Sequence, residues 1–186
     1  MGLSTTYTKT ETDYLLQKLQ SEFTEDRPNI DGLGYKILRK NIVGEKNILT
    51  QAMISSPNTI YEIRYDFDCN NAQITIPANC TLLFNGGSIN NFLKLIGNNT
   101  AIKSNGNGKI FGYDRTLQYI DGNWNIEEWN AGWFGLIADG KITETNDFTI
   151  NSISGTDNYD GLQKALDVAD KCFPKNVRIP NGKYRS

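Results

Sequence analysis

The sequence predicts a mainly β chain with two short helices, one near each end. Three observations indicate this fold class. Residues 59–67 alternate strictly between two faces, as a half-buried strand does. Residues 70–112 carry short apolar runs separated by Asn and Gly clusters. Residues 8–27 and the segment after residue 157 repeat apolar residues at spacings of three and four, which is the helical period.

Composition narrows the class of protein. The 186 residues form one large domain or two small ones, and 19 basic against 21 acidic residues give a net charge of −2. With this balance of charges, we expect no general electrostatic attraction between the chain and nucleic acid. No stretch approaches the ~20 apolar residues of a membrane span, and the first residues lack the order of a signal peptide. We therefore expect a chain made in a cytoplasm, without membrane insertion.

The chain has no histidine and three cysteines. Without histidine, the His-based triads, the His general bases and nearly every catalytic zinc site are excluded. Cys69, Cys80 and Cys172 show no CxxC spacing, and an odd number does not suit a disulfide framework. We expect three small buried hydrophobic residues, and neither a metal site nor a cofactor.

Residues 1–30 are expected to be a helical attachment segment, in which residues 8–27 predict a helix of about four turns. Thr8 and Glu11 have the spacing of a capping box, and Arg27-Pro28 ends the pattern. A helix this short is marginal alone in water, so its apolar stripe must pack on another surface. That surface is either its own domain or further copies of the chain. The stripe comprises Tyr14, Leu15, Leu16, Leu19 and Phe23.

Residues 31–112 predict a β-rich domain. A strand is expected at residues 35–38, and in 59–67 Tyr61, Ile63, Tyr65 and Phe67 share one face. In 70–112 the apolar runs recur every six to ten residues, and the Asn and Gly between them tolerate the left-handed backbone of tight corners. This spacing favours a β-solenoid, in which each strand stacks on its counterpart one coil later. A small antiparallel sandwich gives similar spacing.

Residues 113–156 form an aromatic, irregular linker with Trp124, Trp129, Trp133 and Phe134. These rings suit either a sugar-stacking surface or an apolar plug between two layers.

Residues 157–186 predict a helix and a hairpin. Asp157 or Asn158 can cap the helix, and a strand at 177–179, a turn at 180–182 and a second strand from Lys183-Tyr184 follow it. The sequence stops inside this hairpin, so we expect a longer parent polypeptide. The expected buried face of the helix comprises Leu162, Ala165, Leu166 and Ala169.

Three stretches resemble phage tail proteins. Residues 7–16 (YTKTETDYLL) resemble a phrase found near the start of tail-fibre proteins. Residues 34–39 and 58–68, with the TIP, LLFNGGS and GNNT segments of 74–100, are similar to a β-solenoid module in tail proteins of crAss-like and other Bacteroides phages. Residues 133–140 and 157–184 resemble the opening of pectate-lyase-like β-helices, although about sixteen residues between Asp139-Gly140 and Asp157 stretch the usual spacing.

The resemblance implies a homotrimeric tail fibre or tailspike, located in the virion. Its N-terminal part is expected to anchor a receptor-binding body to other tail proteins, and its distal part to meet a host surface glycan or receptor. It also implies that residues 157–186 begin a right-handed parallel β-helix, and that the N-terminal helix forms a trimeric bundle. The trimer or docking interface is expected at Tyr7, Tyr14, Leu15, Leu16, Leu19 and Phe23.

Two other functions stay open. A polysaccharide-degrading tailspike needs paired carboxylates, and the candidates are Asp66 with Asp68, Glu127 with Glu128, and Asp157 with Asp160. In pectate-lyase-like enzymes the active groove is built by later coils, so we expect no catalytic residue in this chain itself. A carbohydrate-binding module would use Trp124, Trp129 and Trp133.

Overall fold

The structure is a computed structural model that describes residues 12–13, 34–40, 47–106, 108–144 and 150–184. Apart from Thr12 and Asp13, the predicted N-terminal helix lies outside the described residues. The predicted interface lies outside them too: Tyr7, Tyr14, Leu15, Leu16, Leu19 and Phe23.

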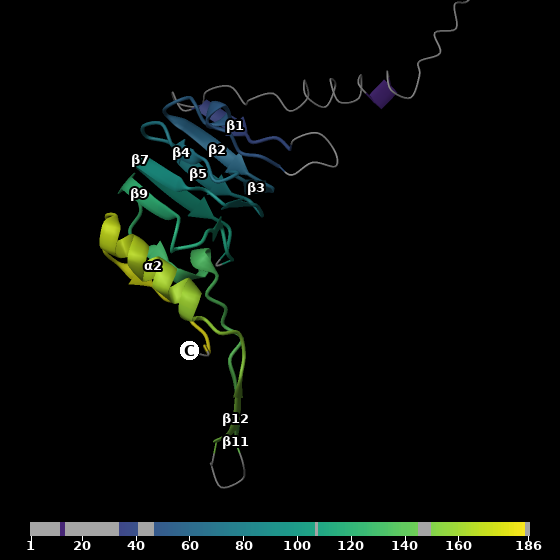
Figure 1. Cartoon of the computed structure of the whole chain (residues 1–186), viewed down its shortest axis with the longest axis vertical. Helices are drawn as coiled ribbons and strands as arrows, with labels where there is room; N and C mark the ends of the chain where they lie inside the picture. Colours follow the sequence, from purple (N-terminus) through teal and green to yellow (C-terminus); the bar gives the residue numbers. More distant parts are fainter. Residues whose placement is uncertain (1–11, 14–33, 41–46, 107, 145–149, 185–186) are drawn as a thin grey trace, which may run out of the picture.

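Parallel strands wind the chain into a β-solenoid of about four turns (Figure 1). A six-stranded sheet covers two of its sides, because β7 (Lys94–Ser104) bends round the corner between them, pairing first with β4 and β9 and then with β5. A three-stranded sheet covers the third side. The remaining strands of the larger sheet are β1 (Gly34–Ile37), β2 (Thr59–Ile63), β4 (Gln73–Thr75), β5 (Thr81–Phe84) and β9 (Tyr119–Trp124). The smaller sheet comprises β3 (Asp66–Asp68), β6 (Ser88–Asn90) and β8 (Phe111–Gly112).

This arrangement confirms the solenoid that the Asn and Gly spacing favours, and the antiparallel sandwich is wrong. The strand expected near Tyr35 is present as β1. The structure also places β9, from the segment expected to be an irregular linker, in the solenoid beside β7.

Inward-facing side chains stack in columns because parallel register keeps equivalent residues adjacent from coil to coil. Each column is apolar and buried, which gives the solenoid one continuous core. The columns are Tyr61–Leu82–Ile102, Phe67–Ile89–Phe111 and Ile74–Leu95–Ile120.

The prediction of one strand over residues 59–67 is wrong. The segment forms two strands, β2 and β3, with a corner at Arg64 and Tyr65. The corner is needed because β2 pairs with β5 in one sheet and β3 pairs with β6 in the other. On the face that was expected to be buried, Tyr61, Ile63 and Phe67 are indeed buried. However, Glu62 on the opposite face is buried as well.

Asparagines turn the corners. Asn58, Asn79 and Asn99 occupy one corner in successive coils, each with a positive φ between 51° and 58°. Their side chains form a ladder, since Asn79 Nδ2 donates to Asn58 Oδ1 (3.1 Å) and Asn99 Nδ2 to Asn79 Oδ1 (2.8 Å). A second corner repeats the arrangement with Asn105 Nδ2 and Asn85 Oδ1 at 3.1 Å.

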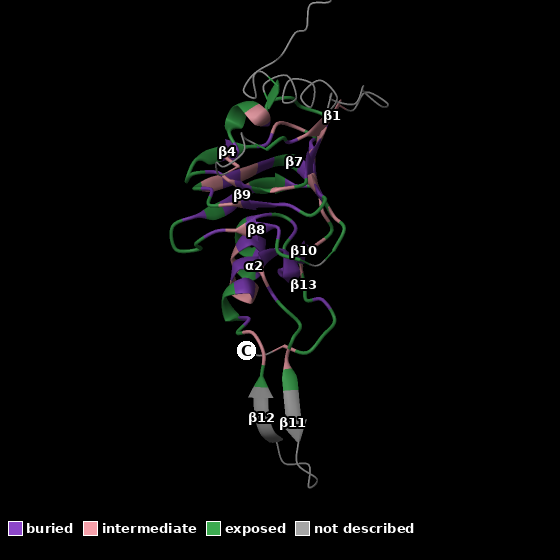
Figure 2. Ribbon diagram, turned by 90° about the vertical axis from the view of Figure 1, so that its right-hand side faces the viewer, coloured by how far each residue is buried: buried purple, intermediate pink, exposed green. Residues whose placement is uncertain are grey.

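The helix α2 (Tyr159–Lys171) covers one end of the core, where it packs against β9 and the 3₁₀ turn η2 (Ala131–Phe134) (Figure 2). A helix was predicted here, and Ala165 and Ala169 are buried as expected. The prediction that Leu166 lies on the buried face is wrong, because this residue is 46% exposed. The buried stripe instead runs through Gly161, Ala165, Val168 and Ala169, and Leu162 is partly buried.

After α2 the chain returns to the solenoid. The predicted strand is present as β13 (Val177–Arg178), which pairs in parallel with β10 (Trp129–Asn130). The second strand predicted at Lys183 and Tyr184 is wrong. The Tyr184 hydroxyl donates to the Pro180 carbonyl, and the Lys183 carbonyl accepts from the Gly140 amide.

Two further elements lie outside the stacked coils. The 3₁₀ turn η1 (Gln51–Met53) precedes β2, and Gln51 bonds to both backbone groups of Thr75. An antiparallel hairpin of β11 (Lys141–Glu144) and β12 (Ile150–Ser154) projects from the body beyond α2 (Figures 1 and 2).

Candidate functional site

Glu62 is the centre of a polar network that joins the first coils of the solenoid. Its side chain is on the outer face of β2, yet the residue is only 2% exposed. Arg64 donates to both carboxylate oxygens, at 2.7 and 2.9 Å, and Asn85 Nδ2 donates at 2.8 Å. The Tyr35 hydroxyl donates from the neighbouring strand β1. The network therefore ties three successive coils together.

The charge of Glu62 is stabilised by these donors. Burial by itself raises the pKa of the carboxyl group, but the hydrogen bonds from Arg64, Tyr35 and Asn85 together outweigh it. The pKa of Glu62 is lowered from 4.5 to about 2. A carboxylate held ionised by several donors is poorly suited to act as a general acid at neutral pH.

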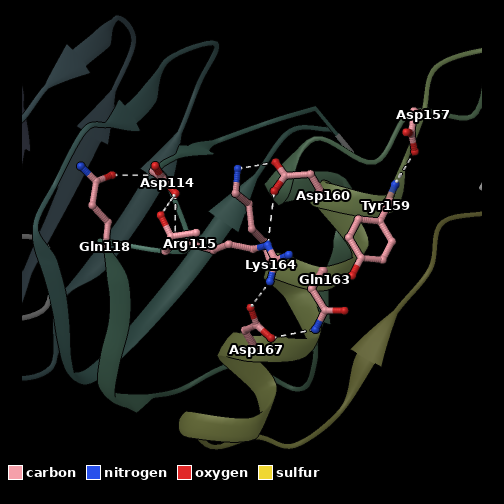
Figure 3. Close-up of polar contacts among 10 residues, drawn as sticks. Asp114, Arg115, Gln118, Asp157, Tyr159, Asp160, Gln163, Lys164 and Asp167 are labelled. Atoms are coloured by element: carbon pink, nitrogen blue, oxygen red, sulfur yellow. Dashed lines mark hydrogen bonds and ion pairs between the residues drawn. The ribbon is translucent and has the colours of Figure 1, made fainter.

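Ion pairs around Arg115, which we call the Arg115 clasp, join α2 to the solenoid. Arg115, in the loop before β9, lies 3.6 Å from a carboxylate oxygen of both Asp160 and Asp167 (Figure 3). Lys164 binds Asp160 at 2.6 Å, and its ammonium group lies over the ring of Tyr113. These contacts fix the helix against the loop and leave no free pair of carboxylates there.

Five of the six predicted carboxylates take part in local structural contacts, and Glu127 is exposed. Asp66 accepts from Ser88 Oγ at 2.6 Å, and Asp68 accepts from the Asn70 backbone amide at 2.6 Å. Asp157 accepts from the Tyr159 amide at the start of α2, and Glu128 pairs with Arg178 at 2.7 Å.

The three predicted tryptophans are buried, and none is more than 8% exposed. Trp124 and Trp129 meet edge to face with ring centroids 5.5 Å apart, and Trp129 packs on Phe134 at 6.1 Å. This supports the interpretation as an apolar plug. The three indoles do not form the exposed stacking surface that a carbohydrate-binding module requires.

The three cysteines are free and buried, as predicted. Burial, reinforced by the charge of Asp68, raises the pKa of the Cys69 thiol to about 12, and burial raises that of Cys172 to about 11. Because the thiolate is the reactive form, these residues act as small hydrophobic side chains.

A groove of about 320 Å³ lies beside the first coil, between the end of β1 and η1. It contains none of the predicted carboxylate pairs. Among the described residues, no group of three or more acidic, Cys or His side chains is placed to hold a metal ion. The groove is lined by Lys36, Ile37, Leu38, Arg39, Ala52 and Met53.

Three features of the structure were not predicted from the sequence: the Glu62 network, the Arg115 clasp and the β11–β12 hairpin. The opposite charges of Glu62 and Arg64, two residues apart on one strand face, were the available signal for the network. Its other donors come from different coils, which requires knowledge of the register.

In the described part of the chain, no helix is long and apolar enough to cross a membrane. Comparison with family models, with curated proteins and with solved structures finds no match to this chain.

Proposed function

We propose that this chain is a structural module of a phage tail fibre or tailspike, which anchors a receptor-binding body to the tail. The observation that carries the proposal is the stack of parallel coils with hydrogen-bonded asparagine corners, closed by α2. Such a stack is a stiff rod, because each coil contacts only its neighbours. The three sequence stretches that resemble tail proteins supply the specific context.

The engaged polar groups support a structural role. Asp66, Asp68, Asp157 and Asp160 each bind a neighbouring donor within the fold. The buried Glu62 spans three coils with its donors. We therefore propose that the chain itself is not catalytic, and that host recognition belongs to a distal part of a longer protein.

Assembly is proposed to be homotrimeric through the N-terminal segment. Apolar residues at helical spacing need a packing surface, and three-strand packing provides one. Other tail proteins are the proposed partners at this end, and the virion is the proposed location. The residues proposed for the interface are Tyr7, Tyr14, Leu15, Leu16, Leu19 and Phe23.

Immunogold electron microscopy tests the location directly. An antibody raised against the purified chain should label the tails of phage particles that encode it, and pre-incubation with the purified chain should abolish the label. Particles without label on the tail, although the antibody detects the chain in infected cells, would contradict the proposal.

A further inference from the structure

We propose that Asn181 is a site of spontaneous deamidation, in which its side-chain amide becomes a carboxylate without the help of an enzyme. The inference goes beyond the proposed function and does not depend on it. It rests on a comparison of three Asn-Gly pairs that the structure describes, at positions 85–86, 105–106 and 181–182.

An Asn-Gly pair carries both of the groups that react. The backbone nitrogen of Gly182 attacks Cγ of Asn181, so that an N–Cγ bond forms and the Cγ–Nδ2 bond breaks. The proton of the Gly182 amide leaves with Nδ2 as ammonia. Water then opens the resulting five-membered imide at either carbonyl, which gives aspartate or isoaspartate. Glycine favours the attack because it has no side chain beside its nitrogen.

Access of water does not distinguish the three pairs. Both residues of each pair are exposed, so the water that opens the imide reaches every one of them. The pairs differ instead in how the asparagine amide is held, because its Cγ has to rotate onto the following nitrogen before the ring can close.

The amide of Asn85 is held at both ends. Its Nδ2 donates to Glu62 Oε1 at 2.8 Å, and its Oδ1 accepts from Asn105 Nδ2 at 3.1 Å. Glu62 is itself fixed, since it is 2% exposed and bonded to Arg64. Two hydrogen bonds must therefore break before Asn85 can react, which slows ring closure by about tenfold or more. Asn105 is restrained by one of these two bonds.

The amide of Asn181 is not restrained in this way. Within the described part of the chain, its side chain has no hydrogen-bond partner, and neither has the backbone amide of Gly182. The side chain can therefore rotate without the loss of a bond, and the attacking nitrogen is available. Of the three pairs, this one meets every requirement of the reaction.

Packing explains why glycine follows Asn181. A Cβ added to Gly182 would lie 2.2 Å from Ala138 Cβ, so no larger residue fits here. The fold thus requires the glycine that makes Asn181 reactive. The next carbonyl, that of Lys183, accepts from the Gly140 amide at 2.9 Å. Isoaspartate adds a carbon to the main chain just before these two contacts, so its formation should displace both.

Peptide mass spectrometry of the full chain, aged at mildly alkaline pH and body temperature, tests the site. Deamidation should accumulate at Asn181 about tenfold faster than at Asn85, because of the two bonds that hold Asn85. Equal rates at the two positions would overturn the proposal. So would an intact Asn181 after a period that converts the same residue in the unfolded chain.

The chain aged in urea is the matched reference. Unfolding removes the restraints, and each asparagine is still followed by glycine, so Asn85, Asn105 and Asn181 should react at similar rates. If Asn181 remains ahead by the same factor in urea, the local sequence rather than the fold sets the rates, and the argument from the structure is wrong.

Two variants test the two halves of the comparison. Asn181→Gln keeps a neutral amide but has to close a larger ring, so modification at this position should disappear. Asn105→Ala removes the donor to Asn85 Oδ1, and it should speed the deamidation of Asn85 several-fold while the rate at Asn181 stays the same. An Asn85 rate that does not respond would contradict its protection by the network.

Hydrogen exchange measures the structural effect. The isoaspartate fraction of the aged chain, separated by chromatography, should exchange the Gly140 amide faster than the fresh chain does. The Asn181→Gln chain, aged for the same time, is the control and should keep the slower exchange. Unchanged exchange at Gly140 in the isoaspartate fraction would show that the contact with Lys183 survives, which contradicts the predicted displacement.

Discussion

At the scale of single residues, the corner asparagines combine a backbone and a side-chain role. A positive φ costs an ordinary L-residue about 1–2 kcal/mol, and Asn bears it better than most. At Asn79 the same residue also gives and accepts a side-chain hydrogen bond along the ladder. Glycine can meet the first requirement but not the second, which explains asparagine at equivalent places in successive coils.

Substitution of Asn79 separates the two roles. Asn79→Ala should lower the free energy of unfolding by about 2 kcal/mol, because both the left-handed backbone and the ladder are penalised. Asn79→Gly keeps the backbone conformation accessible and should lose about 1 kcal/mol. Urea denaturation followed by tryptophan fluorescence measures both. Equal stability of Asn79→Ala and the unchanged protein would contradict the role of the ladder.

Glu62 makes stability depend on acid. Its pKa is about 2 in the folded chain against an ordinary 4.5. A lowered folded-state pKa means that the unfolded chain binds the proton more readily. The stabilisation is therefore complete above about pH 4.5 and is lost as the pH falls toward 2.

Glu62→Gln isolates this contribution from the other carboxylates. The unchanged protein should lose on the order of 2 kcal/mol more stability than the variant between pH 4.5 and 2. The two unfolding curves should converge at the acid end, because a protonated Glu62 resembles Gln. Urea denaturation at a series of pH values measures the difference. Parallel curves over this range would show that Glu62 is not held ionised.

At the scale of elements, α2 closes the apolar core. Val168 and Ala165 are almost inaccessible to water, and they face the end of the solenoid near η2. The Arg115 clasp adds partly exposed ion pairs at the rim, and such pairs contribute little each. Apolar burial, rather than the clasp, is therefore the main reason that the helix stays in place.

Two aspartate substitutions test which face of α2 is buried. Val168→Asp puts an unpaired charge into the core and should cost about 3 kcal/mol or more. Leu166→Asp, at the exposed position, should change stability by about 0.5 kcal/mol or less. Thermal unfolding followed by circular dichroism measures both. A larger loss for Leu166→Asp would place the buried face where the sequence predicted it.

Local chemistry made several elements predictable. The helix after Asn158, the strand at Val177 and the burial of the three cysteines follow from capping, spacing and composition. The Asn and Gly clusters indicated the corners, and Asn70, Asn71, Asn91 and Asn99 of these clusters do adopt positive φ. The aromatic segment left both a sugar-stacking surface and an apolar plug open, and the burial of Trp124 and Trp129 in the structure favours the plug.

Long-range register could not be predicted in the same way. Residues 59–67 alternate without a break, yet Arg64 and Tyr65 form a corner because their neighbours pair in different sheets. The Glu62 site depends on Tyr35 and Asn85, which are 27 and 23 residues away in sequence. Alternation in one strand does not carry information on which strand lies beside it.

At the scale of the whole molecule, the coils, the aromatic plug and α2 form one stacked body, from which the β11–β12 hairpin projects (Figure 1). A rod of this type suits a structural module that holds other parts of an assembly in place, because adjacent coils share their core and their corner hydrogen bonds. Association of copies is then the property on which the proposed function depends.

The molar mass of the purified full chain, measured by light scattering, tests that property most directly. The fibre account predicts a mass close to three times the 20.9 kDa of one chain. A mass of one chain at every concentration would contradict self-assembly into a trimeric fibre module.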